Sequence, residues 1–186
     1  MRNALRCCWA LAMLSLASVV IAPLVQAQES GQYVREVVND RYGALFRHWL
    51  DQDVIWIITP EERDAYLRLS NDDERLQFIR QFWERRNPAP GDPQNKFREE
   101  HYRRIAYANQ HFQVRDDPGW RTDRGRAYIV FGPPDAISPG DVDTLGRPTV
   151  IWHYGAGKTP GGKDRDLTFV DVCWCEDYRL QSPFPK

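Results

Sequence analysis

Residues 118–135 read PGWRTDRGRAYIVFGPPD, and the predicted organisation of the chain depends on this stretch. Upstream of it, apolar residues recur at helical spacing. Within it, Arg126–Phe131 is a nearly continuous apolar run, which predicts a strand that ends at Gly132-Pro133-Pro134. Pro118-Gly119 predicts a turn before that strand. The stretch therefore marks the change from a helical half to a sheet-forming half.

Four helices are expected upstream of this stretch. They cover Gln32–Asp51, a segment starting at Thr59-Pro60-Glu61-Glu62, a segment from Ser70 to Asn87-Pro88, and Gln94–Phe112. The second start is the clearest, because Thr59 suits the N-cap, Pro60 the first helical position, and Glu62 completes a capping box. Between the first two helices, Val54–Ile58 is either a buried strand or an extended connector.

Two further strands are expected downstream, over 149–154 and 167–174. Helices followed by strands is the order of an α+β protein, so we expect an N-terminal helical layer packed on a small antiparallel β-sheet. The expected divisions are a signal peptide (1–27), an N-terminal helix (28–52), an α+β domain (53–175) and a C-terminal tail (176–186).

The N-terminus has the pattern of a secretory signal. Arg2 and Arg6 precede an uncharged, mostly apolar run over residues 7–22, Pro23 breaks it, and Val25-Gln26-Ala27 offers a small-x-small cleavage site. An uncleaved anchor is the alternative, although the run is short for a span of about 20 residues. We expect a protein exported to the periplasm or secreted, with no membrane span after cleavage.

Loss of that signal would leave two cysteines, Cys173 and Cys175. In a strand, their Cα atoms would lie roughly 6.5–7 Å apart, at the outer limit for a disulfide. Three interpretations remain open. The residues are small apolar side chains near a strand end, form a disulfide within or between chains, or bind a metal for which His153 is the obvious additional ligand.

Composition argues against two classes of partner. The formal net charge is −1, whereas proteins that bind polyanions are usually basic, so no nucleic acid is expected. Gly155-Ala156-Gly157-Lys158-Thr159 ends like a phosphate-binding loop, but it lacks the first glycine of that motif, and Pro160 follows it. We therefore expect a glycine-rich loop between strands and no nucleotide.

Gly119, Trp120, Thr122 and Asp123 spell a motif that resembles the GWxTD-domain family of exported bacterial proteins. The resemblance extends over Asp53–Asp171. Because the family is functionally uncharacterised, the resemblance implies no activity, cofactor or catalytic residue.

The motif has a structural and a partner-binding interpretation. The residues concerned are Gly119, Trp120, Thr122, Asp123, Arg124, Gly125, Arg126, Gly132, Pro133, Pro134 and Asp135. In the structural interpretation, Trp120 is buried, Thr122 or Asp123 accepts backbone hydrogen bonds in a turn, and Asp123 pairs with an arginine such as Arg124 or Arg126. Alternatively, the eleven basic residues between Arg80 and Arg126, against seven acidic ones, bind an anionic group of a partner or form a salt-bridge network.

The sequence favours a non-catalytic interaction or structural module of the bacterial cell envelope, with another envelope protein as partner. The alternative is an envelope hydrolase that uses Asp123 or Asp135 with His153 as an acid–base pair. No Gly-x-Ser-x-Gly or His-Glu-x-x-His motif occurs. We expect no cofactor, no metal and no catalytic residue.

Overall fold

The computed structural model describes residues 43–159 and 161–184 of the 186-residue chain. The signal peptide expected at residues 1–27 and the first part of the helix expected from Gln32 lie outside the described residues. From Leu45 onward, the chain forms one compact unit.

The helices upstream of the motif follow their local signals. Residues 43–48 are helical and continue into the π-helical turn η1 (Trp49–Asp53). Helix α2 (Pro60–Leu67) has the expected capping box, in which Thr59 and Glu62 each accept the backbone N–H of the other. Helices α3 (Asp72–Glu84) and α4 (Lys96–His111) are capped by the side chains of Asn71 and Asn95.

The segment Val54–Ile58 is neither a strand nor an extended connector. It forms a tight turn, because the N–H groups of Ile57 and Ile58 both donate to the carbonyl of Val54. Val54 is fully buried among the helices, and Trp56 packs against the core beneath the sheet. The run is apolar because the turn is covered on several sides.

The strand predicted at Arg126–Phe131 is wrong, since these residues belong to helix α5 (Asp123–Phe131). Thr122 caps its start by accepting the N–H of Gly125, and Gly132 ends it at φ 81°. Neighbouring helices and the sheet cover most of its circumference, so Ala127, Tyr128 and Ile129 are all buried. A helix buried on most sides gives a continuous apolar run without helical alternation.

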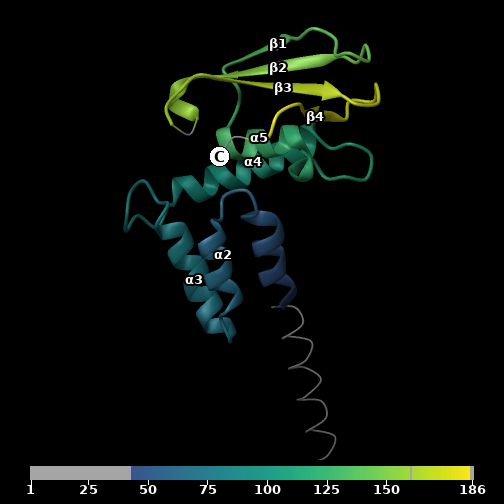
Figure 1. Cartoon of the computed structure of the whole chain (residues 1–186). Helices are drawn as coiled ribbons and strands as arrows, with labels where there is room; N and C mark the ends of the chain where they lie inside the picture. The colour runs from purple at the N-terminus through teal and green to yellow at the C-terminus, as the bar shows by residue number, and fades with distance from the viewer. Residues whose placement is uncertain (1–42, 160, 185–186) are drawn as a thin grey trace, which may run out of the picture. The chain divides into compact units, whose positions relative to one another are not determined.

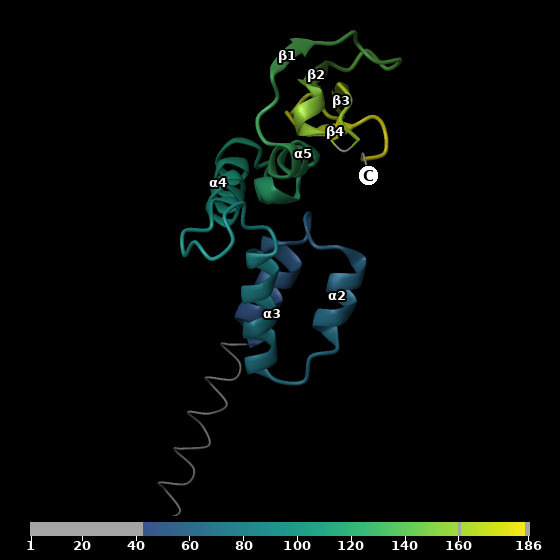
Figure 2. The same ribbon diagram turned by 90° about the vertical axis from the view of Figure 1, so that its left-hand side faces the viewer.

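The sheet has four antiparallel strands in the order β1-β2-β3-β4. They are β1 (Ala136–Pro139), β2 (Thr149–Tyr154), β3 (Arg165–Asp171) and β4 (Tyr178–Leu180). Figure 1 shows α5 lying against the sheet with α4 beside it, and Figure 2 gives the same elements in a view turned by 90°. The α+β class with helices mostly preceding the sheet is therefore confirmed. β2 matches its prediction, β3 ends earlier than expected, and β1 and β4 were not predicted.

Two hydrophobic clusters hold this unit together. The first joins α4 and α5 to β2 and β3, with Trp152, Leu167 and Phe169 among its buried residues. The second joins η1, α2 and α3 around Trp49 and Phe82. Within residues 43–159 and 161–184, none of the helices has the length and apolar character needed to cross a membrane.

Candidate functional site

The two glycines of the motif permit close contact between helices. A Cβ atom on Gly119 would lie 1.8 Å from the carbonyl oxygen of Ala108 in α4. One on Gly125 would lie 1.8 Å from the carbonyl oxygen of Gly119. Both neighbours are backbone atoms that cannot rotate away, so α4, the 3₁₀ turn η2 (Gly119–Arg121) and α5 pack in a way that only glycine allows.

Trp120 and Thr122 fix the turn between α4 and α5. The Trp120 N–H donates to Asn109 Oδ1 at 2.9 Å, and its carbonyl accepts from the Trp56 indole at 2.9 Å. The Trp120 ring is partly buried against the core beneath the sheet. Thr122 Oγ1 donates to the Gly119 carbonyl while it accepts from Gly125. Both residues act on neighbouring backbone inside the molecule.

Asp123 binds the edge strand of the sheet. Its Oδ2 accepts the N–H of Leu180 in β4 at 2.8 Å. It forms no ion pair with Arg124, Arg126 or any other arginine in the described part of the chain, so the expected pairing is wrong. The carboxylate instead supplies the hydrogen-bond acceptor that an edge-strand N–H lacks.

The two arginines of α5 lie on aromatic rings. Arg124 lies 4.3 Å from the Tyr178 ring centroid and donates to the Glu176 carbonyl. Arg126 lies 3.9 Å from the Phe184 centroid and 4.5 Å from that of Trp56. Its Nε is buried and has no hydrogen-bond partner among the described residues. Burial lowers the pKa of Arg126, and the nearby Asp123 partly opposes this effect. Both arginines therefore hold the C-terminal residues against α5.

The segment after α5 makes internal contacts as well. The Gly132 carbonyl accepts the hydroxyl of Tyr154, and the Pro133 carbonyl accepts from Lys158. Asp135 binds Lys158 and accepts the N–H of Gly155 at 2.7 Å, and these contacts, Lys158 first, lower the pKa of its carboxyl. Lys158 occupies the position of the lysine in a phosphate-binding loop, but here it is bonded to Pro133 and Asp135, just before β1.

Four of the eleven basic residues counted between Arg80 and Arg126 form ion pairs within the fold. The pairs are Glu62 with Arg85 and Arg86, and Glu100 with Arg103 and Arg104. Burial alone would raise the pKa of Glu62, but hydrogen bonds from Arg86 and Arg85 lower it to about 2. The salt-bridge interpretation of these arginines therefore describes them better than an anion site does.

His153 has different partners from those proposed for a hydrolase. Its Nε2 lies 2.9 Å from Ser138 Oγ in β1, and its Nδ1 lies 2.7 Å from Asp166 Oδ1 in β3. Asp123 and Asp135 bind elsewhere and are not brought to the ring. The three side chains lie on the sheet face opposite Trp152 and Leu167, in the order of contacts of a Ser-His-Asp triad. Sequence reasoning missed Ser138 and Asp166, because only the strand register places them beside His153.

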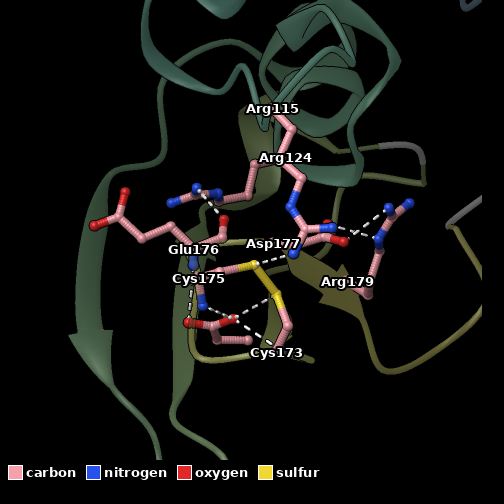
Figure 3. Close-up of a disulfide and its surroundings, with 8 residues drawn as sticks. Arg115, Arg124, Cys173, Cys175, Glu176, Asp177 and Arg179 are labelled. Carbon is pink, nitrogen blue, oxygen red and sulfur yellow. Dashed lines mark hydrogen bonds and ion pairs between the residues drawn. A yellow bond between two sulfur atoms is a disulfide. The ribbon is translucent and has the colours of Figure 1, made fainter.

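Cys173 and Cys175 are joined in a disulfide, shown in Figure 3. The predicted strand over 167–174 ends at Asp171 instead, and the chain then turns sharply through Trp174 at φ 52°. This turn brings the Cα atoms to 5.2 Å, closer than a strand allows. Asp171, which is buried, accepts the backbone N–H groups of Cys173, Cys175 and Glu176.

A metal site at the cysteines has little support from the geometry. One oxygen of Asp171 and the two sulfurs lie within 4.8 Å of one another. Sulfurs bonded to each other are not thiolate ligands, however, and three groups are fewer than a structural zinc requires. Thr149 of β2 pairs with Val170, near the end of β3 that leads to the cysteines. His153 lies four residues farther along β2, about 13 Å from Thr149, so it is too distant to complete a metal site there.

A groove of about 610 Å³ lies between α3 and α4. Trp49, Trp83 and Tyr102 contribute aromatic side chains to its lining. The lining also includes two basic residues, Arg80 and Arg98, and two acidic ones, Glu84 and Asp92. The indole Nε1 of Trp49 is buried and has no hydrogen-bond partner in the described part of the chain. An apolar lining with a few charged groups suits a small ligand or one side chain of a peptide.

Comparison with known proteins supports the family resemblance that the motif indicates. A family model described as the GWxTD domain matches residues 24–170. Searches of curated proteins and of solved structures found no match. Since the family model covers most of the chain, and Gly119, Trp120, Thr122 and Asp123 form the junction between α4 and α5, the chain belongs to the GWxTD-domain family.

Proposed function

We propose that this chain is a non-catalytic interaction module of the bacterial cell envelope, and that the free edge of β1 binds an extended segment of another envelope protein. One observation carries the proposal. The sheet has two edge strands, and among residues 43–159 and 161–184 other elements cover only β4.

The backbone of β1 supports strand addition. In an antiparallel pair, alternate residues turn their N–H and C=O groups toward the partner strand. Gly140 donates to Thr149, and the register continues as Ser138 with Ile151, so Ile137 turns its backbone groups away from β2. An unpaired N–H and C=O on an edge strand is the feature that peptide segments use to extend a sheet.

The side chains around this edge are unusually apolar for a surface. Ile137 is 58% exposed, and Val142 and Leu145, in the loop that follows β1, are 66% and 68% exposed. Single exposed apolar residues are common, but three within nine positions beside an open edge favour a binding surface. Together they suit a partner that presents apolar side chains on an extended backbone.

The experiment compares matched surface variants in capture from envelope extracts. Ile137→Lys and Leu145→Lys place charges beside the edge and should abolish capture of the partner. Leu67→Lys is the control, because Leu67 in α2 is 61% exposed and lies far from β1 in sequence and fold. If all three variants capture the same partner as the wild type, the β1 edge is not the binding surface.

Export is the second part of the proposal and rests on residues 1–27. Intact-mass measurement of the protein recovered after export should give a chain that begins at Gln28. A full-length mass would contradict cleavage and favour an uncleaved anchor.

A hydrolase remains the second candidate, on the basis of the Ser138–His153–Asp166 geometry. Against it, the Asp166 side chain is 61% exposed, whereas the carboxylate of a working triad is buried. A fluorophosphonate probe tests it directly, since an activated serine reacts and an ordinary one does not. Covalent labelling that is lost in both Ser138→Ala and His153→Ala would favour the hydrolase.

A further inference from the structure

We propose that the Cys173–Cys175 disulfide is a thiol–disulfide exchange site, which oxidises dithiols of a partner protein. This inference concerns the turn after β3 and does not depend on what binds the β1 edge.

The backbone around the disulfide is unfavourable in a way found nowhere else in the described residues. Arg115, Trp174 and Glu176 are the three non-glycine residues at positive φ in residues 43–159 and 161–184, at 52°, 52° and 67°. All three lie at this one site, as Figure 3 shows for Arg115 and Glu176 beside the two cysteines. Such conformations cost free energy and are concentrated at functional sites. Trp174 is 64% exposed, so burial of its ring does little to offset the cost of its backbone conformation.

Two charged groups are placed to act differently on the two sulfurs. Arg115 Nη2 lies 3.7 Å from Cys175 Sγ, so its guanidinium would stabilise a thiolate there. Asp171 Oδ1 lies 3.8 Å from Cys173 Sγ, and an oxygen of this carboxylate lies within 4.8 Å of both sulfurs. The carboxylate accepts the S–H of Cys173 and opposes a thiolate on either cysteine, but only Cys175 has the Arg115 guanidinium beside it to compensate. Cys175 is also the more exposed of the two. The arrangement separates an exposed, thiolate-forming cysteine from a second one that remains protonated.

Hydrogen bonds to Asp171 hold the loop in addition to the sulfur–sulfur bond. Asp171 accepts the N–H groups of Cys173, Cys175 and Glu176 at 3.3, 3.1 and 3.0 Å. Burial raises the pKa of Asp171, but these three hydrogen bonds outweigh it and lower the pKa, so the carboxylate stays charged. Reduction should therefore leave the two thiols close together, which makes the exchange reversible.

The exchange balances with a partner dithiol as the reductant. One partner thiolate attacks Cys175 Sγ, the Cys173–Cys175 bond breaks, and Cys173 takes up a proton as its thiol. The second partner thiolate then attacks the partner's sulfur in the mixed disulfide, and Cys175 leaves as a thiolate beside Arg115. The partner gains a disulfide and loses two electrons, which the two cysteines accept.

The first test measures the equilibrium between the Cys173–Cys175 dithiol and its disulfide in mixtures of reduced and oxidised dithiothreitol. Free thiols are trapped by alkylation, and the products are quantified by mass spectrometry. The full chain carries Cys7→Ser and Cys8→Ser, so that only the two relevant sulfurs react. Arg115→Gln should shift the equilibrium at least tenfold toward the disulfide, about 30 mV for a two-electron couple. Arg115→Lys keeps the positive charge, so its equilibrium should lie close to that of the wild type. Arg121→Gln is the control, because that guanidinium lies over Trp120 and not at the cysteines.

The second test separates the two sulfurs and does not require the Arg115 variants to fold. Iodoacetamide alkylation is followed against pH in Cys173→Ser, which leaves Cys175, and in Cys175→Ser, which leaves Cys173. Cys175 should reach half its maximal rate at a lower pH than Cys173, and only Cys175 should form a stable mixed disulfide with glutathione. Equal pH profiles for the two cysteines, or an equilibrium that Arg115→Gln leaves unchanged, would overturn the proposal.

Other charged groups lie near the two cysteines. Besides Arg115 and Asp171, these are Arg124, which donates to the Glu176 carbonyl, and Asp177, which pairs with Arg179. Neither Arg124 nor Arg179 is bonded to a sulfur. The alkylation difference should therefore follow Arg115 and Asp171, and an Asp177→Asn variant should keep it.

Discussion

The two edges of the sheet differ in what covers them. At β4, Asp123 of α5 accepts the outward N–H of Leu180, and Arg124 lies on the Tyr178 ring. At β1, the backbone of Ile137 faces outward beside exposed apolar side chains. The motif that identifies the family therefore closes one edge of the sheet. Function is better sought at the surface that the motif leaves open.

The largest expected effect comes from breaking the junction that closes the β4 edge. Gly119→Ala and Gly125→Ala each place a Cβ 1.8 Å from a backbone oxygen, so we expect loss of at least about 4 kcal/mol and little folded protein. Circular dichroism and solubility report this. Gly157→Ala is the matched control, since nothing lies within 4 Å of its Cβ and its φ is ordinary. Normal melting of either motif variant would contradict the close contact.

A smaller loss is expected from removing the acceptor at the β4 edge. Asp123→Ala leaves the Leu180 N–H without a partner, which should lower the free energy of unfolding by about 1–3 kcal/mol. Asp123→Asn keeps an oxygen acceptor and should cost less. Urea denaturation measures both. If Asp123→Asn costs as much as Asp123→Ala, the negative charge and not the hydrogen bond is responsible.

The two charged residues of α5 should act independently. Asp123 bonds to β4 and Arg126 lies between Trp56 and Phe184, so they share no direct contact. In a double-mutant cycle of Asp123→Ala and Arg126→Ala, the coupling energy should stay within about 0.5 kcal/mol. A coupling of 1.5 kcal/mol or more would indicate that an ion pair forms in solution.

The smallest effect on stability is expected at the open edge. Ile137→Lys should change the free energy of unfolding by less than about 0.5 kcal/mol, because the side chain is exposed and the outward backbone is unpaired. The same variant should lose its partner. A large destabilisation would show that other parts of the chain cover β1, and the contrast between the edges would disappear.

Features set by neighbouring residues were predictable from the sequence. The capping box of Thr59 and Glu62 needs only four successive positions, and its prediction is confirmed. The strand predicted over 149–154 is likewise confirmed. The apolar run over 126–131 led to a wrong strand prediction, because a helix surrounded by core residues has the same composition as a buried strand.

Features set by strand register were not predictable. The partners of His153 come from β1 and β3, so no spacing in the sequence points to Ser138 or Asp166. The contact between Arg115 and Cys175 also spans 60 positions, because it joins two loops that only the fold brings together. The ion pair between Asp123 and Arg126 was expected because the two residues are close in sequence. In the fold, Asp123 binds the N–H of Leu180, and Arg126 lies on the rings of Trp56 and Phe184.

In the part of the chain that the structure describes, the sheet has one free edge, and this limits how large an assembly can grow through it. If two copies paired through β1, each would use its open edge, and the opposite edge of each would still be covered by α5. A third copy would find no strand to extend. Self-association by this route therefore stops at a dimer and cannot continue into a fibril, although the free edge itself carries apolar side chains.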